Sequence, residues 1–160
     1  MPELPRFIAD VMLGRLAKWL RLFGYDTLYS RHYDDRTLIR ISKQEGRILL
    51  TRDTGITKSK ACGEHIALRS EQIDVQVLEV ARALKKWPPA AFPESPRCSL
   101  CNGAVRMEEL KALMDELPEH VFLQQGAFFR CLVCGKVYWH GSHVHEIASV
   151  RAIFLKEISS

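Results

Sequence analysis

Short apolar runs and longer segments of helical periodicity alternate along the first half of the chain. The apolar runs occupy residues 6–10, 26–30 and 47–53, with a weaker one at 65–68. Residues 11–23, 35–46 and 73–86 carry apolar side chains three and four positions apart, the spacing of a helix packed on one face. A shorter helix is expected over 56–61. This alternation predicts an α/β fold with right-handed crossovers, a parallel sheet and helices on both faces.

Several polar residues and glycines mark where these elements end. Gly24 and Gly46 stand where left-handed caps would close the first two long helices, and Asp35 is expected to be the N-cap of the second. Asp10 and Asp53 are each the last residue of one of these runs. In a parallel sheet such residues lie at the carboxyl edge, where open α/β sheets bind their ligands.

The pattern changes beyond residue 87. Four of the seven prolines lie within residues 88–96, which predicts a stiff, extended linker. A helix is expected over 108–116, short strands over 128–129 and 137–139, and a last helix over 146–157 that packs back on the first module. The predicted division is an α/β domain over 1–87, a linker over 88–97, a cysteine-rich ribbon over 98–145 and a C-terminal helix or tail over 146–160.

Composition narrows the functional classes only slightly. The 160 residues are 47% hydrophobic and 26% charged, and no apolar run approaches the ~20 residues that span a bilayer. The N-terminus lacks the features of a signal peptide, so a cytoplasmic protein with no membrane partner is expected. A net charge of +4 is compatible with a polyanionic partner but is too small to require one.

Two Cys-x-x-Cys pairs form the strongest local signal. Cys98 and Cys101 precede Cys131 and Cys134 by 29 intervening residues, a gap that the helix expected over 108–116 would fill. Four thiolates predict a closed tetrahedral zinc site with a structural role, and a redox dithiol is the less favoured alternative. Such a module depends on its metal, whereas residues 6–87 are expected to stay folded without it. Cys62 is expected to be a small, half-buried hydrophobic residue.

Three aspartates are candidates for a second metal site. Each of Asp10, Asp35 and Asp53 also stands where an N-cap would stand, and taken singly capping is the commoner role. Together they would converge at one edge of the sheet and repel one another unless a cation bound between them. Carboxylate oxygens suit Mg²⁺ or Mn²⁺, and such an ion supports hydrolysis of a phosphodiester.

Basic residues near this edge are candidates for phosphate contact. Arg15, Lys18 and Arg21 are three positions apart and are expected to form a stripe on an exposed flank of the first helix. An ordinary solvated helix face is the commoner explanation of such a stripe. Arg52, beside Asp53, is a further candidate.

The combination of these motifs resembles the Mut-seven C-terminal RNase family. The segments that carry the likeness are Phe7-Ile-Ala-Asp10, residues 12–26, Ile48-Leu-Leu-Thr-Arg-Asp53, both cysteine pairs and Tyr138-Trp-His-Gly-Ser-His143. The resemblance covers about residues 6–145. It implies a PIN-like α/β fold with an appended zinc ribbon and Mg²⁺- or Mn²⁺-dependent cleavage of RNA.

The same resemblance implies roles for individual residues. Asp10, Asp35 and Asp53 match the acids of the family, and Thr51 supports them. Many PIN nucleases have a fourth acid shortly after the third, whereas Thr54, Gly55 and Ile56 follow here, which favours a single ion. Expected RNA contacts are Arg15, Lys18, Arg21, Arg52 and His143, with Ser142 in support.

A metal-dependent endoribonuclease is therefore the leading hypothesis. The first alternative is a catalytically silent RNA- or ribosome-binding module that docks on a ribosome or protein partner through the zinc ribbon. A toxin-like PIN protein neutralised by a partner is less favoured, because the ribbon and tail exceed a minimal toxin.

Overall fold

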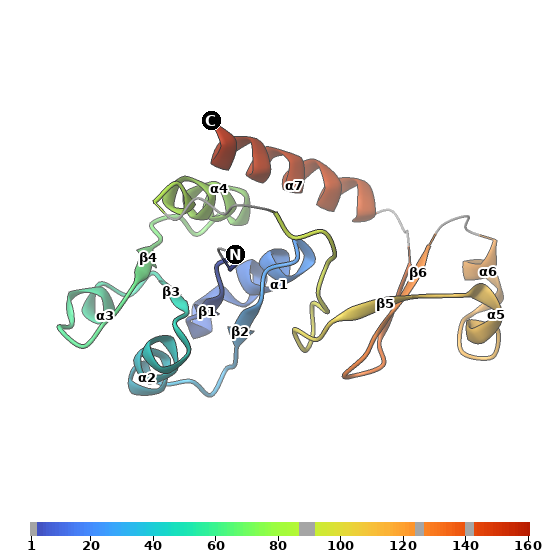
Figure 1. Cartoon of the computed structure of the whole chain (residues 1–160), viewed down its shortest axis with the longest axis horizontal. Coiled ribbons are helices and arrows are strands. Elements are labelled where there is room, and N and C mark those ends of the chain that lie inside the picture. The colour runs from blue at the N-terminus through green and yellow to red at the C-terminus, as the bar shows by residue number, and fades with distance from the viewer. Residues whose placement is uncertain (1–2, 87–91, 124–126, 140–142) are drawn as a thin grey trace.

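A parallel sheet forms the centre of the first module. The computed structural model describes residues 3–86, 92–123, 127–139 and 143–160. Strands β1 (Phe7–Ala9), β2 (Thr27–Tyr29), β3 (Ile48–Thr51) and β4 (His65–Ala67) lie in the order β2-β1-β3-β4, and all neighbours are parallel (Figure 1). The register pairs Ala9 with both Tyr29 and Leu50, so β1 and β3 run through the middle of the sheet.

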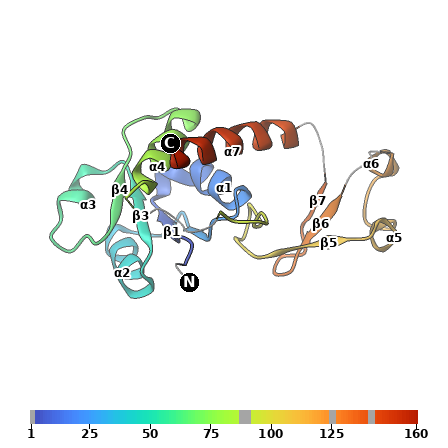
Figure 2. The same ribbon diagram turned by 45° about the horizontal axis from the view of Figure 1, so that its top comes forward.

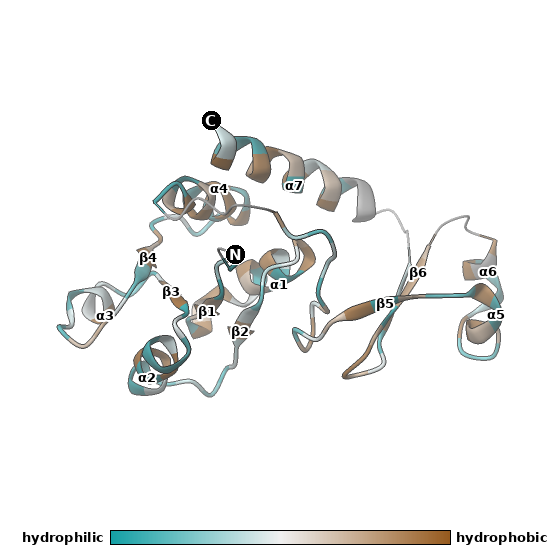
Figure 3. Cartoon of the chain, viewed as in Figure 1, coloured by the Kyte–Doolittle hydropathy of each residue, from teal (hydrophilic) through white to brown (hydrophobic). Residues whose placement is uncertain are grey.

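Helices cover both faces of this sheet. The chain passes through a 3-10 helix, η1 (Val11–Leu13), then α1 (Gly14–Leu22), α2 (Asp35–Glu45), α3 (Thr54–Lys58) and α4 (Ile73–Leu84). Side chains of a strand point alternately to opposite faces. Phe7 and Leu50 therefore join the cluster that includes α1 and α4, whereas Ile8 and Leu49 pack with α2 and α3. The predicted α/β fold is confirmed, and Figure 3 shows the hydrophobic colouring of β1 and β3.

The last helix packs on the first module, as expected. Helix α7 (His143–Ser159) begins three residues before the predicted start and lies beside α4 (Figure 2). Its Phe154 is completely buried, with ring centroids 5.1 Å from Phe23 and 5.7 Å from Tyr25. The C-terminal segment is thus part of the core that covers one face of the sheet.

A separate antiparallel sheet forms the ribbon. It consists of β5 (Val105–Glu108), β6 (Phe128–Cys131) and β7 (Val137–Trp139), with short helices α5 (Leu110–Leu113) and α6 (Glu119–Phe122) between β5 and β6. The strands expected at 128–129 and 137–139 are confirmed. The helix expected over 108–116 is wrong at both ends, because Glu108 pairs with Phe128 and ends a strand, and the helix itself covers only Leu110–Leu113. Pairing across the sheet overrides the local helical pattern.

Three local predictions are also tested. Gly24 has a φ of 100°, as a left-handed cap requires. Helix α3 starts directly after Asp53, two residues before the predicted start. The N-cap of α2 is Asp34 and not Asp35, since the Asp34 carboxylate accepts a hydrogen bond from the Thr37 N–H at 2.8 Å.

The proline-rich segment is docked on the first module where it is described. Residues 88–91 lie outside the described part. Pro93 is buried, and its carbonyl accepts a hydrogen bond from Arg151 of α7 at 2.6 Å. A Cβ atom at Gly24 would lie 2.3 Å from the Pro93 side chain, so this close approach needs a glycine. In the described ranges no helix has the length and apolar character that crossing a membrane requires.

Candidate functional site

A chain of hydrogen bonds joins two of the three candidate aspartates. The Asp53 N–H donates to Oγ1 of Thr51 at 2.9 Å, and that hydroxyl donates to Oδ2 of Asp10 at 2.8 Å. Thr51 is completely buried at the end of β3. Because β1 and β3 are neighbouring parallel strands, Thr51 fixes both acids at the carboxyl edge of the sheet.

The two aspartates differ in their surroundings. Asp10 is buried, and its Oδ1 accepts the Val11 N–H at 2.6 Å, so it caps η1. Asp53 is exposed and caps α3 through a 2.7 Å hydrogen bond from the Gly55 N–H. Capping therefore holds for both residues. Each carboxylate oxygen has more than one lone pair, so capping leaves acceptor capacity for a cation.

Asp35 lies at the same edge of the sheet but on a helix. It is exposed in the first turn of α2, a helix that packs against β1 and β3. Because α2 follows β2, its N-terminus lies at the carboxyl edge of the sheet. Asp34 takes the capping role, so the Asp35 side chain is not committed to the cap.

The three carboxylates do not form a closed cluster. Over the described ranges, the group of His, Cys, Asp or Glu residues whose ligand atoms all lie within 4.8 Å of one another is the set of four cysteines. Asp10, Asp35 and Asp53 are more widely spread. Oxygen is nonetheless the donor type that Mg²⁺ prefers, and this ion commonly keeps several waters and takes only one or two carboxylates. The donor set therefore fits a hydrated hard cation.

The basic stripe on α1 is shorter than predicted. Arg15 and Lys18 are exposed, as expected. Arg21 is buried, so its expected place on the exposed flank is wrong. Its guanidinium donates to the carbonyls of Thr27 at 2.8 Å, Ser99 at 3.0 Å and Leu100 at 3.1 Å. Arg21 ties the first module to the ribbon and is not available to RNA.

The remaining predicted RNA contacts and their support are Arg52, His143 and Ser142. Arg52 is half-exposed and pairs with Glu71 at 3.0 Å. Ser142 lies outside the described residues, as does the side chain of His143. The roles predicted for these three residues stay predictions.

The four cysteines come together at the base of the ribbon. Their sulfur atoms all lie within 4.8 Å of one another, with Cys98 and Cys134 3.6 Å apart and Cys101 and Cys131 3.4 Å apart. A tetrahedral zinc site with Zn–S bonds of about 2.3 Å places its sulfurs about 3.8 Å apart. A Cβ atom at Gly103 would lie 2.9 Å from the Cys131 sulfur, so only glycine fits beside it. The arrangement suits a metal ion held by sulfur.

The ionisation of these thiols also points to a cation. Burial opposes the Cys98 thiolate, but hydrogen bonds from Tyr138 and from two backbone N–H groups outweigh it and lower the pKa of Cys98 to about 6. Burial and the neighbouring sulfurs raise the pKa of Cys101 to about 12. Four thiolates at this distance repel one another, so their joint ionisation requires a positive ion between them.

Asn102 is a connecting residue that the sequence analysis missed. It follows Cys101 with a φ of 68°, and its side chain accepts from the Thr27 N–H at 3.0 Å and donates to Asp26 at 2.7 Å. Arg47 also binds Asp26, at 2.8 and 3.2 Å. An asparagine directly after a cysteine knuckle was the available signal, since asparagine tolerates left-handed backbone. The metal site and β2 are therefore directly joined.

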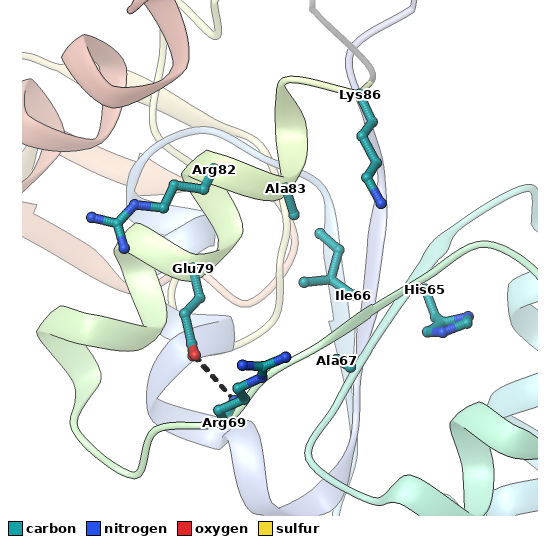
Figure 4. A pocket seen from close by; sticks show the side chains of 8 residues that line it. All are labelled: His65, Ile66, Ala67, Arg69, Glu79, Arg82, Ala83 and Lys86. Atoms are coloured by element: carbon teal, nitrogen blue, oxygen red, sulfur yellow. Dashed lines mark hydrogen bonds between the residues drawn. The ribbon is translucent and has the colours of Figure 1, made fainter.

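A basic cavity of about 420 Å³ lies along β4. Figure 4 shows Glu79 of α4 turned toward the backbone of Arg69, whose N–H it accepts at 3.2 Å. Arg82 and Lys86 line the same cavity. Glu79 and the ion pair of Arg82 with Glu157 of α7 offset part of this positive charge.

Together, the parallel sheet with acids at its carboxyl edge and the four-cysteine centre define an α/β domain with an appended metal-binding ribbon. The family model of the Mut7-C RNAse domain matches residues 5–151, and the chain belongs to that family. The family description associates the chain with nucleases and with RNA as the class of substrate.

One curated relative gives a more distant comparison. The chain is 24% identical to the human protein described as exonuclease mut-7 homolog, over 92% of this chain. The match covers 26% of that protein, so the chain spans about a quarter of its relative's length. No solved structure matches this chain significantly.

Proposed function

We propose that the chain is a PIN-type endoribonuclease that hydrolyses RNA with a Mg²⁺ or Mn²⁺ ion held by Asp10, Asp35 and Asp53. The observation that carries the proposal is the Thr51 hydroxyl, which links Asp10 to the backbone of Asp53 inside the protein. A buried threonine that orients two acids is the kind of support that a metal site requires. Membership of an RNase family supports the same proposal.

The residues of the chain have separate tasks in this reaction. The Thr51 hydroxyl oxygen accepts a hydrogen bond from the Asp53 N–H and donates its proton to the Asp10 carboxylate. This pair of hydrogen bonds fixes the orientation of the Asp10 carboxylate. The exposed Asp35 and Asp53 provide the solvent-facing acceptors. A bound divalent ion would supply an acidified water and neutralise the charge that develops on the phosphate. Arg15 and Lys18 would hold neighbouring phosphates of the substrate.

The cysteine centre is proposed to hold zinc in a structural role. All four donors are sulfur, which leaves no open position for substrate. The proposed division is an α/β domain over 1–87, a linker over 88–97, a ribbon over 98–145 and a C-terminal helix over 146–160 that packs on the first domain. The proposed setting is the cytoplasm, where thiols stay reduced and available to a metal.

A silent RNA- or ribosome-binding module is the second candidate. The spread of the three carboxylates favours it, because the acids do not form a closed cluster by themselves. In this alternative the ribbon would dock on a ribosome or protein partner and the acids would serve only as helix caps.

The test compares the wild-type protein with Asp53→Asn on single-stranded RNA in Mn²⁺. Asparagine caps a helix about as well as aspartate but removes the charge, so cleavage should fall by a hundredfold or more while stability changes little. Asp115→Asn is the matched control, since Asp115 is an exposed acid of the ribbon, in the segment that follows α5, and not of the sheet edge. Equal cleavage by all three proteins would identify a contaminant, and absence of cleavage would favour the silent module.

A circular RNA distinguishes internal cleavage from digestion at an end. An endonuclease linearises the circle, whereas an exonuclease leaves it intact and degrades only the linear form. Omission of Mg²⁺ and Mn²⁺ is a better metal control than a chelator, because a chelator also removes metal from the cysteines.

A further inference from the structure

A large cavity lies between the first module and the ribbon. Its volume is about 670 Å³, within the range of pockets that enclose small organic groups. Residues from the end of α1, the segment after residue 93, the ribbon strands and α7 line it. Each module thus supplies part of the wall.

Aromatic side chains form the ribbon side of this cavity. Phe129 of β6 and Tyr138 of β7 are direct partners across the antiparallel sheet and share one face. Trp139 pairs with Phe128 on the other face and lines the cavity at the edge where β7 ends. Trp139 is 39% exposed, which is unusual for so large an apolar side chain. Aromatic side chains around a cavity suit the face of a planar ring.

Cations surround the aromatic wall. Arg97, Lys136 and Arg151 line the cavity, and Glu94 is the carboxylate that accompanies them among the described lining residues. The Lys136 ammonium lies 5.0 Å from the centre of the Tyr138 ring. The occupant therefore combines an apolar planar part with negative charge.

A second cavity connects this site with α1. Its volume is about 320 Å³, and it shares Leu22, Ser99 and Ile147 with the larger one. Arg15 and Lys18 line it together with Trp19 and Glu146. A basic path therefore runs from the first turn of α1, just after Asp10, to the aromatic wall of the ribbon.

We propose that the larger cavity binds an unpaired nucleobase of single-stranded RNA whose phosphates pass Arg15 and Lys18. The inference rests on the proposed RNA substrate but not on catalysis. Stacking on aromatic side chains together with cations along the backbone is how proteins hold single strands. The nine residues of α1 span about 14 Å, so the site lies several nucleotides from the aspartates. An RNA too short to reach it should be a poor substrate.

The test measures RNA affinity by fluorescence anisotropy with zinc-loaded protein and no added Mg²⁺ or Mn²⁺. Trp139→Ala should weaken binding of oligoadenylate about tenfold, the usual effect of losing one stacked base. Trp139→Phe keeps a flat ring and should retain most of the affinity. Leu123→Ala is the matched control, because Leu123 is an exposed apolar residue of the ribbon away from the cavity. Zinc content and circular dichroism establish that each variant is folded.

The contribution of the Lys136 charge is tested separately from that of the Trp139 ring. Lys136→Gln should make the slope of log K against log salt less steep by roughly 0.7. Lys111 is an exposed lysine of α5, and Lys111→Gln should leave the slope unchanged. Inorganic polyphosphate has no bases, so it should bind the wild type and Trp139→Ala equally.

The outcomes separate this site from the proposed nuclease. If RNA binding depends on Trp139 but the wild-type protein does not cleave RNA, the base site is supported and the proposed nuclease activity is overturned. Cleavage by a wild type whose affinity equals that of Trp139→Ala overturns the base site and leaves the nuclease standing. Equal loss in Trp139→Ala and Leu123→Ala also overturns it.

Discussion

The Thr51 hydroxyl lies 2.8 Å from Oδ2 of Asp10 and donates to it, so a residue at the end of β3 fixes an acid at the end of β1. Both side chains are buried. The same hydroxyl accepts the Asp53 N–H, which makes Thr51 the shared support of two candidate metal ligands. Serine could replace it, whereas valine has the shape but neither hydrogen bond.

Thr51→Val should therefore affect activity more than fold. Loss of the hydroxyl leaves Asp10 with an unmet acceptor and should lower the free energy of unfolding by about 1–3 kcal/mol. Because Asp10 also loses its orientation, cleavage or metal affinity should fall by about 10- to 100-fold. Thr51→Ser should restore most of both. Urea unfolding and initial cleavage rates measure the two effects, and normal activity in Thr51→Val would remove the supporting role.

The sheet and its two-sided cover could be predicted because local periodicity and burial agree along residues 6–84. Each apolar run became a strand, and Phe7 and Ile8 point to opposite faces as alternation requires. The four-cysteine centre was equally predictable, since the chemistry of Cys-x-x-Cys pairs is local.

The parts that failed depend on contacts far apart in sequence. Arg21 has the spacing of an exposed cation, yet carbonyls from the knuckle 78 and 79 residues away bury it. Glu108 has a helical pattern but pairs with Phe128. Neither partner can be inferred from the residues beside it, because tertiary pairing overrides local propensity.

Loss of the ribbon's metal should loosen part of the first module as well. The sequence alone predicts that residues 6–87 stay folded, but Asn102 and Arg21 join the knuckle to β2. In Cys131→Ser, hydrogen exchange should rise throughout the ribbon and also at residues 25–29, while β3 stays protected. Cys62→Ser is the control because Cys62 lies outside the cysteine centre. Elemental analysis should find one zinc per wild-type chain, and unchanged exchange at 25–29 would contradict the coupling.

Asp26 should make the protein sensitive to acid. Burial tends to raise the pKa of this carboxyl, but hydrogen bonds from Arg47 and Asn102 outweigh burial and hold it below its ordinary value. A lowered pKa in the folded state gives stability that is complete above the unfolded pKa of about 4 and is lost as the pH falls through the folded value.

Asp26→Asn tests this linkage. The substitution should lower the free energy of unfolding at pH 7 by about 2 kcal/mol, less than for a fully buried pair because the Asp26 side chain is 22% exposed. The difference from the wild type should shrink below about pH 4. Urea unfolding between pH 7 and pH 3 measures it, and a gap of constant size over that range would argue against the linkage.

The cations of α1 should separate into two classes. Gln at both Arg15 and Lys18 should flatten the salt dependence of RNA affinity by roughly 0.7 per lost contact, with little change in stability. Arg21→Gln should instead destabilise the protein by about 2 kcal/mol or more, because buried carbonyls of Thr27 and Ser99 lose a charged donor. An unchanged salt slope in the double variant would make the exposed pair an ordinary solvated face.

The neighbouring Asp34 and Asp35 give the sharpest test of a catalytic role for the acid at α2. The Asp34 carboxylate accepts the Thr37 N–H, and that hydrogen bond holds the pKa of Asp34 below its ordinary value. Asp34→Ala should therefore lower the urea midpoint, while cleavage at saturating metal stays close to that of the wild type. Asp35 has the same charge one residue away but does not cap the helix.

Asp35→Asn should show the opposite result. Removal of its charge weakens the proposed metal site, so cleavage should fall by a hundredfold or more and the Mn²⁺ concentration for half-maximal activity should rise. Stability should change by less than about 0.5 kcal/mol, as for other exposed substitutions. Because the two residues share their charge and their place at the start of α2, general electrostatics would affect both variants alike. Equal activity in Asp34→Ala and Asp35→Asn would remove Asp35 from the site and leave Asp10 and Asp53 as its proposed ligands.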